Sequence, residues 1–206
     1  MRVAIIGGTG AFGRALATRL RASGDEAVIG SRDESRAIEL AATYGVEGGR
    51  NEDVVKDVDL VVLATRSSAA LETAEALSGA IGETPLLCVA SDLRFEKNGV
   101  LPGRLGRSLA EEVAEVVEAP VAAGLQSLAA AELAGSDAPG QDALICGDDA
   151  RAKEVSMAFA TRLVSGRVLD AGPLANSRGL EGMTAVILNL NKRYGGHAGI
   201  VVTGLP

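Results

Sequence analysis

The sequence predicts an α/β protein with a Rossmann-type, doubly wound and mostly parallel sheet and a small C-terminal helical extension. Strand-like and helix-like segments alternate over nearly the whole chain. A glycine-rich turn joins the first apolar strand to the first helix, as in βαβ units. The predicted strand 59–65 is an uninterrupted apolar run, which is typical of a strand that helices cover on both faces.

The length and composition narrow the organisation and the partners. The 206 residues suit one domain, 1–206, in which about 171–206 form a helix for substrate binding or dimerisation. The sequence is 47% hydrophobic and only 2% aromatic, so the predicted core is aliphatic. The net charge of −7 argues against a nucleic-acid partner and against an anionic membrane surface, because both require a basic face.

The N-terminus and the cysteines indicate a cytoplasmic protein. No apolar run is long enough to span a membrane, and the chain enters a strand at once without a signal-peptide pattern. Cys88 and Cys146 lie far apart in predicted strands, which favours two buried reduced thiols over a disulfide or a metal pair. The single histidine, His197, argues against a His-based metal site.

The glycine-rich turn predicts a dinucleotide site. Apolar residues 3–6 form the strand, and residues 14–21 have the periodicity of the helix. We expect Gly8 to permit the tight turn, Gly10 to let the backbone approach a pyrophosphate, and Gly13 to let the helix pack closely. The N-terminus of the helix then offers N–H groups to the phosphates. The alternative is a turn that needs glycine only for its backbone angles.

The end of the second predicted strand, 27–29, indicates which dinucleotide binds. NAD-binding domains place an acidic residue here to hold the ribose 2′-OH. This chain has Ser31 and Arg32, with Arg36 four residues further on the same helical face. A hydroxyl and two guanidinium groups suit a 2′-phosphate, so we interpret them as an NADP clamp. The alternative is a helix N-terminus that Ser31 caps, with two solvated arginines.

The carboxyl edge of the predicted sheet is the expected ligand side. Ala64 and Thr65 end the fourth strand there, and their small size would let a nicotinamide or its ribose lie on the backbone. The loop 91–106 lies at the same edge and is expected to form part of a substrate wall. The pair Asp148 and Asp149 is interpreted as the N-cap region of a helix rather than a metal site.

The other elements follow from periodicity. Helices are predicted over 34–44, 51–56, 68–79, 109–117, 150–163 and 175–194, strands over 85–90, 121–125, 143–146 and 167–170, and a short strand or loop over 46–49. The helix 175–194 is apolar over much of its circumference, which predicts burial against its own sheet and against a second subunit. The tail 199–203 is expected to be an edge strand or a strand exchanged between subunits.

Several stretches along the whole chain match one family. They are MRVAIIGGTG at 1–10, IGSR at 29–32, CGDD at 146–149, LDAGPLANSR at 169–178, and then ILN at 187–189, NKRY at 191–194 and HAG at 197–199. With these residues the chain resembles the NADPH-dependent reductases of the deazaflavin coenzyme F(420), which pass hydride between NADP and 8-hydroxy-5-deazaflavin. The stretch 169–178 is more specific than the glycine-rich turn.

The resemblance implies a set of roles. The residues from Thr9 through Gly10 and Ala11 to Phe12 would wrap the pyrophosphate, and the clamp described above would hold the 2′-phosphate. The turn that ends at Ala130 matches the place where the family's backbone holds the nicotinamide amide. NADP would be the cofactor, coenzyme F(420) the co-substrate, and the protein a homodimer. No catalytic side chain is assigned, because hydride transfer between the two rings needs little acid–base help.

The chain departs from the family at positions expected around the nicotinamide and the deazaflavin. It has Arg66-Ser67 and Ala69 where the family tends to show Pro-Trp and then His, and Ser91-Asp92-Leu93 where relatives often have an Asn-Pro step. Gln126 stands in place of His and Ala129 in place of Pro. Two alternatives therefore stay open. One is an NADPH-dependent reductase of another flavin, an imine or a carbonyl compound, for which Ser91, Asp92 or Tyr194 would donate the proton. The other is a non-catalytic NADP sensor.

Overall fold

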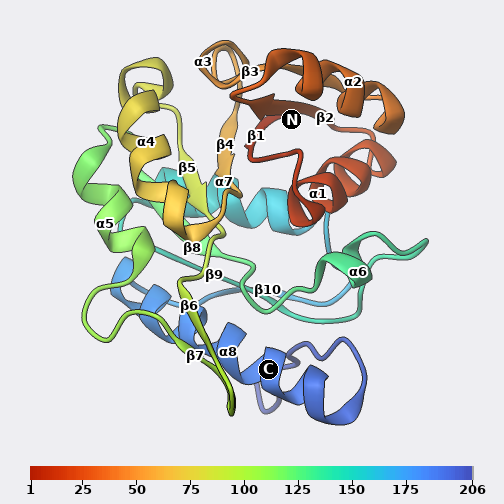
Figure 1. Ribbon diagram of the computed structural model, residues 1–206, viewed down its shortest axis with the longest axis vertical. Coiled ribbons are helices and arrows are strands. Elements are labelled where there is room, and N and C mark those ends of the chain that lie inside the picture. The colour runs from red at the N-terminus through yellow and green to blue at the C-terminus, as the bar shows by residue number, and fades with distance from the viewer. Residues whose placement is uncertain (206) are drawn as a thin grey trace.

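The computed structural model describes residues 1–205 and is built around one eight-stranded sheet with the order β10-β9-β8-β5-β4-β1-β2-β3 (Figure 1). The strands of this sheet are β1 (Arg2–Ile6), β2 (Glu26–Ser31), β3 (Glu47–Arg50), β4 (Leu60–Leu63), β5 (Leu86–Cys88), β8 (Val121–Gly124), β9 (Ala143–Gly147) and β10 (Val168–Asp170).

Six strands, from β3 to β8 in the spatial order, run parallel. β9 pairs antiparallel with β8, and β10 runs parallel to β9. The predicted doubly wound and mostly parallel sheet is therefore confirmed. The chain moves outward from β1 to β3 and then returns to place β4 on the other side of β1, so the sheet has a topological switch point between β1 and β4.

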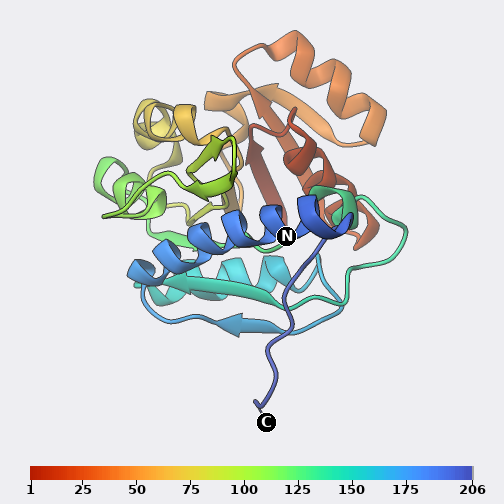
Figure 2. The same cartoon turned by 60° about the horizontal axis from the view of Figure 1, so that its bottom comes forward.

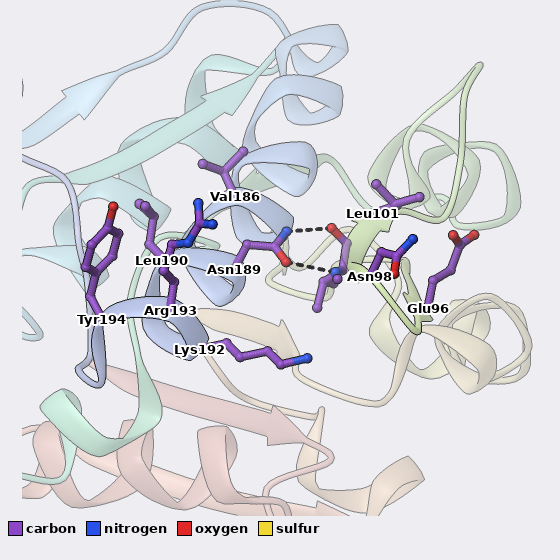
Figure 3. Close-up of a pocket in the computed structure, with 11 residues that line it drawn as sticks. Glu96, Asn98, Leu101, Val186, Asn189, Leu190, Lys192, Arg193 and Tyr194 are labelled. Carbon is purple, nitrogen blue, oxygen red and sulfur yellow. Dashed lines mark hydrogen bonds between the residues drawn. The ribbon is translucent and has the colours of Figure 1, made fainter.

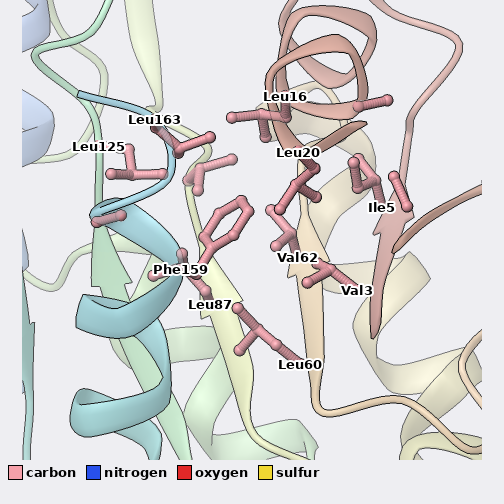
Figure 4. Close-up of a cluster of buried hydrophobic side chains, with 14 of the residues drawn as sticks. Val3, Ile5, Leu16, Leu20, Leu60, Val62, Leu87, Leu125, Phe159 and Leu163 are labelled. Carbon is pink, nitrogen blue, oxygen red and sulfur yellow. The ribbon is translucent and has the colours of Figure 1, made fainter. Parts of the chain in front are cut away.

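Helices cover both faces of the sheet. They are α1 (Ala11–Ala22), α2 (Glu34–Tyr44), α3 (Asn51–Val54), α4 (Ser67–Ile81), α5 (Leu109–Val116), α6 (Ala130–Leu133), α7 (Ala150–Ala160) and α8 (Ser177–Tyr194). Alternate strand residues enter two cores: Val3 and Ile5 meet α1 and α7 on one face, whereas Ala4 and Ile6 share the other with α4 and α5. Figure 4 shows the first core, in which Phe159 of α7 fills the space beside α1. This alternation explains why the central strands carry consecutive apolar residues, at 3–6 in β1 and 60–63 in β4.

Three helices begin at the side-chain caps that the sequence offers. Asp33 accepts a hydrogen bond from the N–H of Arg36 at the start of α2 (3.0 Å), and Asp149 accepts one from Ala152 at the start of α7 (2.8 Å). Ser108 and Glu111 form a capping box at the start of α5. The interpretation of Asp149 as a cap is confirmed. Its neighbour Asp148 instead accepts a hydrogen bond from the N–H of Leu174 (3.0 Å).

The segment predicted as a loop over 91–106 contains a two-stranded antiparallel hairpin, β6 (Leu93–Glu96) and β7 (Gly99–Pro102). The side-chain amide of Asn189 on α8 holds it, accepting from the N–H of Val100 (3.0 Å) and donating to its carbonyl (2.7 Å). Figure 3 shows both bonds and the shallow cavity between hairpin and helix. These short strands are stabilised by Asn189, which lies far away in the sequence. Local sequence patterns therefore do not predict the hairpin.

The C-terminal extension differs from the prediction at both ends. A short 3-10 turn, Leu174–Asn176, precedes α8, so the helix begins at Ser177 rather than at 175. The expectation of an edge strand over 199–203 is wrong, because this tail crosses the start of β9 without pairing as a strand (Figure 2). Asp142 fixes it: its N–H donates to the carbonyl of Ile200 (2.8 Å), and its carboxylate accepts from the N–H of Val202 (2.8 Å).

Both cysteines are free, and each is fully buried in the sheet, as predicted. Burial raises the pKa of the Cys88 and Cys146 thiols to about 12, so they are protonated at neutral pH. Within residues 1–205, no helix combines the length and the apolar character that a membrane crossing requires.

Candidate dinucleotide site

A cavity of about 580 Å³ opens at the carboxyl ends of β1, β2 and β4, at the switch point of the sheet. It brings together most of the cofactor-binding residues that the sequence predicts: Thr9, Gly10, Ser31, Arg32, Arg36, Ala64 and Thr65 line it. Residues separated by more than 50 positions in the sequence thus share one cavity because parallel strands end at the same edge.

Of the glycines in the turn, Gly8 has a different role from the one predicted, and Gly13 has the predicted one. The left-handed backbone angle belongs to Gly7 (φ +84°), so Gly7 and not Gly8 permits the tight turn. A Cβ on Gly8 would lie 2.6 Å from Ile29 Cγ2, which makes Gly8 a close-packing position. A Cβ on Gly13 would lie 2.6 Å from the Gly8 Cα, so the predicted close packing of the helix is confirmed. The turn needs all three glycines to pass between β1, β2 and α1.

The N-terminus of α1 is suited to bind an anion. Its N-cap is Gly10, which has no side chain to accept a hydrogen bond, and its first turn contains no acidic residue. Side-chain caps occur at α2, α5 and α7, whereas α3, α4, α6 and α8 begin without one, as α1 does. Uncapped N–H groups at a cavity, together with the positive end of the helix dipole, favour a phosphate.

The three residues of the predicted clamp lie together at the end of β2 and the start of α2. Ser31 accepts a hydrogen bond from the N–H of Asp33 (3.2 Å), and Asp33 caps α2. The alternative in which Ser31 caps this helix is therefore wrong. Arg32 and Arg36 are exposed along the cavity rim, and within residues 1–205 neither guanidinium joins an ion pair.

A third arginine lines the same cavity. Arg66 precedes α4 as its N-cap residue and lies on the rim with Arg32 and Arg36, while Ala69 and Thr73 of α4 form the adjacent wall. We expected Arg66 and Ala69 around the nicotinamide and the deazaflavin, and the structure places them in the cavity that holds the clamp. Three guanidinium groups at one cavity in a chain of net charge −7 mark a local site for an anion.

Asn51 is a cavity residue that the sequence pattern did not reveal. The sequence predicts only that Asn51 begins a helix. In the structure it is the first residue of α3, and its side chain is buried beside Gly30. The oxygens Asn51 Oδ1 and Thr65 Oγ1 are buried without a hydrogen-bond partner among the described residues. Unsatisfied polar atoms at a cavity wall fit a site that a polar ligand completes.

A strained turn follows β8 at the same edge of the sheet. Leu125 has a left-handed backbone angle (φ +71°), which a non-glycine residue seldom adopts. The carbonyl of Gln126 accepts a hydrogen bond from Thr184 of α8 (3.1 Å), and Thr184 also shares one with Ser91 (2.9 Å). The turn and the loop after β5 are thus both tied to α8 before the chain reaches Ala130.

Four predicted cofactor-binding residues do not line the cavity. Gly8 is buried, and Ala11 is exposed at the first position of α1. Phe12 and Ala130 are half-buried against the core that lies between α1 and the sheet. Ala130 is the first residue of α6, which the structure places next to α1.

The sheet order, the glycine turn and the cavity at the switch point define a Rossmann-type dinucleotide-binding protein. The family described as NADP oxidoreductase, coenzyme F420-dependent, matches residues 2–90. An F420-dependent NADP reductase of Methanothermobacter thermautotrophicus is 31% identical over all of this chain and 96% of its own length. One of Methanocaldococcus jannaschii is 33% identical over all of this chain and 99% of its own. The chain belongs to the family of F420-dependent NADP oxidoreductases, as the resemblance predicted.

The solved structures agree with this fold. A crystal structure from Arthrobacter sp. FB24, described as a candidate F420-dependent NADP reductase, superposes with a TM-score of 0.84. It covers 98% of this chain and 99% of its own at 23% identity. At that identity the likeness supports the architecture, including the C-terminal helix.

Proposed function

We propose that this protein transfers a hydride between NADP(H) and the deazaflavin coenzyme F420. The observation that carries the proposal is the cavity at the switch point, where Ser31, Arg32 and Arg36 meet the uncapped N-terminus of α1. These groups suit a dinucleotide that carries an extra phosphate. Membership in the F420-dependent family supports the deazaflavin as the second substrate.

We assign the parts of NADP to the cavity as follows. The segment from Thr9 to Phe12 and the amides of α1 hold the pyrophosphate. The clamp holds the 2′-phosphate, because guanidinium groups bind phosphate oxygens with charge-assisted hydrogen bonds. Ala64 and Thr65 lie under the nicotinamide ribose, and the backbone at Ala130 receives the nicotinamide amide. Thr65 supports this assignment, since its hydroxyl is buried and has no partner within residues 1–205.

The nicotinamide supplies the hydride chemistry when NADP is bound. The protein orients the reacting rings and excludes water from them. Small residues at the sheet edge, Ala64, Ala90 and Ala129, leave room for two flat rings to lie together. Two groups that could donate a proton to a carbonyl substrate are engaged elsewhere: Ser91 is hydrogen-bonded to Thr184 (2.9 Å) and Asp92 pairs with Arg104 (3.0 Å). This arrangement favours a reaction in which neither Ser91 nor Asp92 acts as the acid.

The test is reduction of oxidised F420 by NADPH, followed by the loss of the deazaflavin's visible absorbance. Turnover with F420, and none with flavins, imines or carbonyl compounds, is the expected result. If the protein reduces one of those acceptors and does not reduce F420, that acceptor and not the deazaflavin is the substrate. Tight NADPH binding without turnover of any acceptor would make the protein a sensor.

We also propose a homodimer formed through α8, with residues 1–206 as one NADP-binding domain and about 171–206 as its dimerisation and substrate segment. Val186, Leu190 and Tyr194 follow one another at helical spacing, and 58%, 42% and 76% of their respective surfaces are exposed. Figure 3 shows them along one side of α8 beside Leu101 of the hairpin. An apolar stripe of this kind on a helix supports contact with a second copy.

We place the protein in the cytoplasm. Its two thiols are free and buried, which agrees with a reducing compartment. Fractionation of cells that produce the tagged protein tests this placement, and recovery outside the cytoplasm would overturn it.

A further inference from the structure

One arginine of α1 is buried and has no carboxylate partner within residues 1–205. Arg19 is 6% exposed, and among these residues its guanidinium donates to backbone carbonyls alone. Its Nε donates to Leu133 (3.1 Å), its Nη1 to Ser136 (3.4 Å), and its Nη2 to Gly135 and Asp137 (both 2.7 Å). All four carbonyls belong to one segment of the chain more than 110 residues away.

That segment continues the strained turn after β8. Leu133 ends α6, and Gly135, Ser136 and Asp137 form the loop that follows it. A helix of four residues leaves its last carbonyls without partners inside the helix. The Arg19 guanidinium satisfies the carbonyl of Leu133 at the end of this helix, and it also binds three carbonyls of the loop that follows. The buried side chain of Leu133 packs in the core that α1 shares. Figures 1 and 2 both place α6 beside α1.

We infer that Arg19 is a positioning residue that fixes the nicotinamide end of the NADP site relative to the pyrophosphate end. The inference rests on the proposed function, in which Ala130 at the start of α6 receives the nicotinamide amide. Helix α1 begins at the pyrophosphate site with Ala11, and Arg19 lies eight residues along it, about 12 Å at 1.5 Å per residue. One rigid helix therefore carries both the phosphate-binding amides and the group that holds α6.

The chemistry of the contact requires arginine. A guanidinium is planar, stays protonated and has five N–H donors in a fixed fork, so it can serve four carbonyls from one position. A lysine ammonium has three donors on a flexible stem and cannot reproduce this fork. A methionine of similar length would leave the carbonyls unsatisfied and release α6.

The experiment compares Arg19→Met and Arg19→Lys with Arg21→Met. Arg21 is the control because it lies on the same helix, is exposed, and donates one hydrogen bond to the carbonyl of Tyr44 (3.2 Å). Two probes are titrated into each protein: NADPH, which spans the whole site, and adenosine 2′,5′-bisphosphate, which reaches only the clamp. The fluorescence of the reduced nicotinamide on binding reports whether its ring is held.

We expect Arg19→Met to weaken NADPH binding by about tenfold and to lower the hydride-transfer rate by about ten- to a hundredfold, because small displacements of a reacting group have effects of this size. Adenosine 2′,5′-bisphosphate should bind within about twofold of wild type. Arg19→Lys should give intermediate values, and it carries the test if Arg19→Met does not fold. Arg21→Met should match wild type in every measurement.

Two results would overturn the inference. One is an equal loss of affinity for NADPH and for adenosine 2′,5′-bisphosphate, which indicates a general loss of structure. The other is unchanged NADPH binding and nicotinamide fluorescence in both Arg19 variants. Failure of the proposed function gives a different result. Wild-type protein that binds NADPH but does not reduce F420 would overturn the acceptor and leave the comparison of the two probes valid.

Discussion

At the scale of single residues, the proposed function assigns the choice of dinucleotide to Arg32. It is exposed on the cavity rim, and within residues 1–205 no carboxylate neutralises it by an ion pair. We expect Arg32→Asp to weaken NADPH binding by about 10- to 100-fold, roughly 1.4–2.8 kcal/mol, because a negative charge would then face the 2′-phosphate. NADH has no such phosphate and should be affected far less. Binding isotherms for both dinucleotides measure the difference.

The matched control is Arg94→Asp, which changes an exposed arginine on the hairpin strand β6. It should leave the affinity for both dinucleotides unchanged, which separates the clamp from a general effect of net charge. Equal affinity of the wild-type protein for NADH and NADPH would contradict the clamp, and so would an Arg32→Asp protein with unchanged NADPH affinity.

The stability of the contact between Asp142 and the C-terminal tail depends on pH. Hydrogen bonds from Arg167 and from the N–H groups of Val202 and Arg167 lower the pKa of this carboxyl to about 2. A carboxyl in an unfolded chain has a pKa of about 3.9. The folded pKa is the lower one, so the stabilisation is complete above about pH 4 and is lost as the pH falls towards 2.

Thermal unfolding of wild type should therefore shift to lower temperature between about pH 4 and pH 2, and Asp142→Asn should show a shallower dependence. Asp57→Asn, at an exposed position with a left-handed backbone that asparagine tolerates, is the control and should follow wild type. Identical pH profiles for wild type and Asp142→Asn would show that the tail contact contributes nothing.

The residues of the candidate site differ in how far the sequence reveals them. Ser31, Arg32 and Arg36 follow from one local rule, because the end of the second strand in a βαβ unit meets the ribose. The sequence predicts that Gly8 permits the tight turn, whereas the structure gives the left-handed position of the turn to Gly7. Which glycine takes that position depends on how closely the turn packs against Ala64 and Ile29, and these residues are distant in the sequence. Asn51 enters the cavity from a different βα connection, which only the folded sheet brings close.

At the scale of elements, the hairpin depends on α8. The amide of Asn189 makes two hydrogen bonds to the backbone of Val100, as a neighbouring strand would. We expect Asn189→Ala to cost about 1–3 kcal/mol locally, from two hydrogen bonds. Amide hydrogen exchange of residues 93–102 should accelerate, while the rest of the sheet keeps its protection. Lys192→Ala, at an exposed position of the same helix, should leave the exchange pattern unchanged.

If the hairpin amides of Asn189→Ala exchange at the wild-type rate, the hairpin is stable without this contact. The same dependence explains why the sequence predicted a loop here. The strands LRFE and GVLP are only four residues long, and GVLP ends in proline. The long parallel strands, by contrast, have runs of buried apolar residues and were predicted from sequence with errors of one or two residues at their ends.

At the scale of the whole molecule, the alternation of strands and helices was enough to predict the doubly wound sheet. It could not predict the direction of β9, because an antiparallel strand in the middle of buried neighbours has the same apolar pattern as a parallel one. Nor could it predict the path of the tail. The sequence VVT over 201–203 has strand propensity, but Asp142 and Arg167 take its hydrogen bonds.

The proposed homodimer makes a prediction about the whole assembly. Leu190 lies in the middle of the apolar stripe of α8 and is 42% exposed. We expect Leu190→Glu to convert a dimer into a monomer in sedimentation equilibrium at micromolar concentration, because an interface that buries an unpaired carboxylate loses several kcal/mol. Leu105→Glu is the matched control, since Leu105 is 92% exposed on a loop outside the stripe. It should remain dimeric. A wild-type protein that sediments as a monomer at every concentration, or a dimeric Leu190→Glu, would remove α8 as the interface and leave the stripe without a partner.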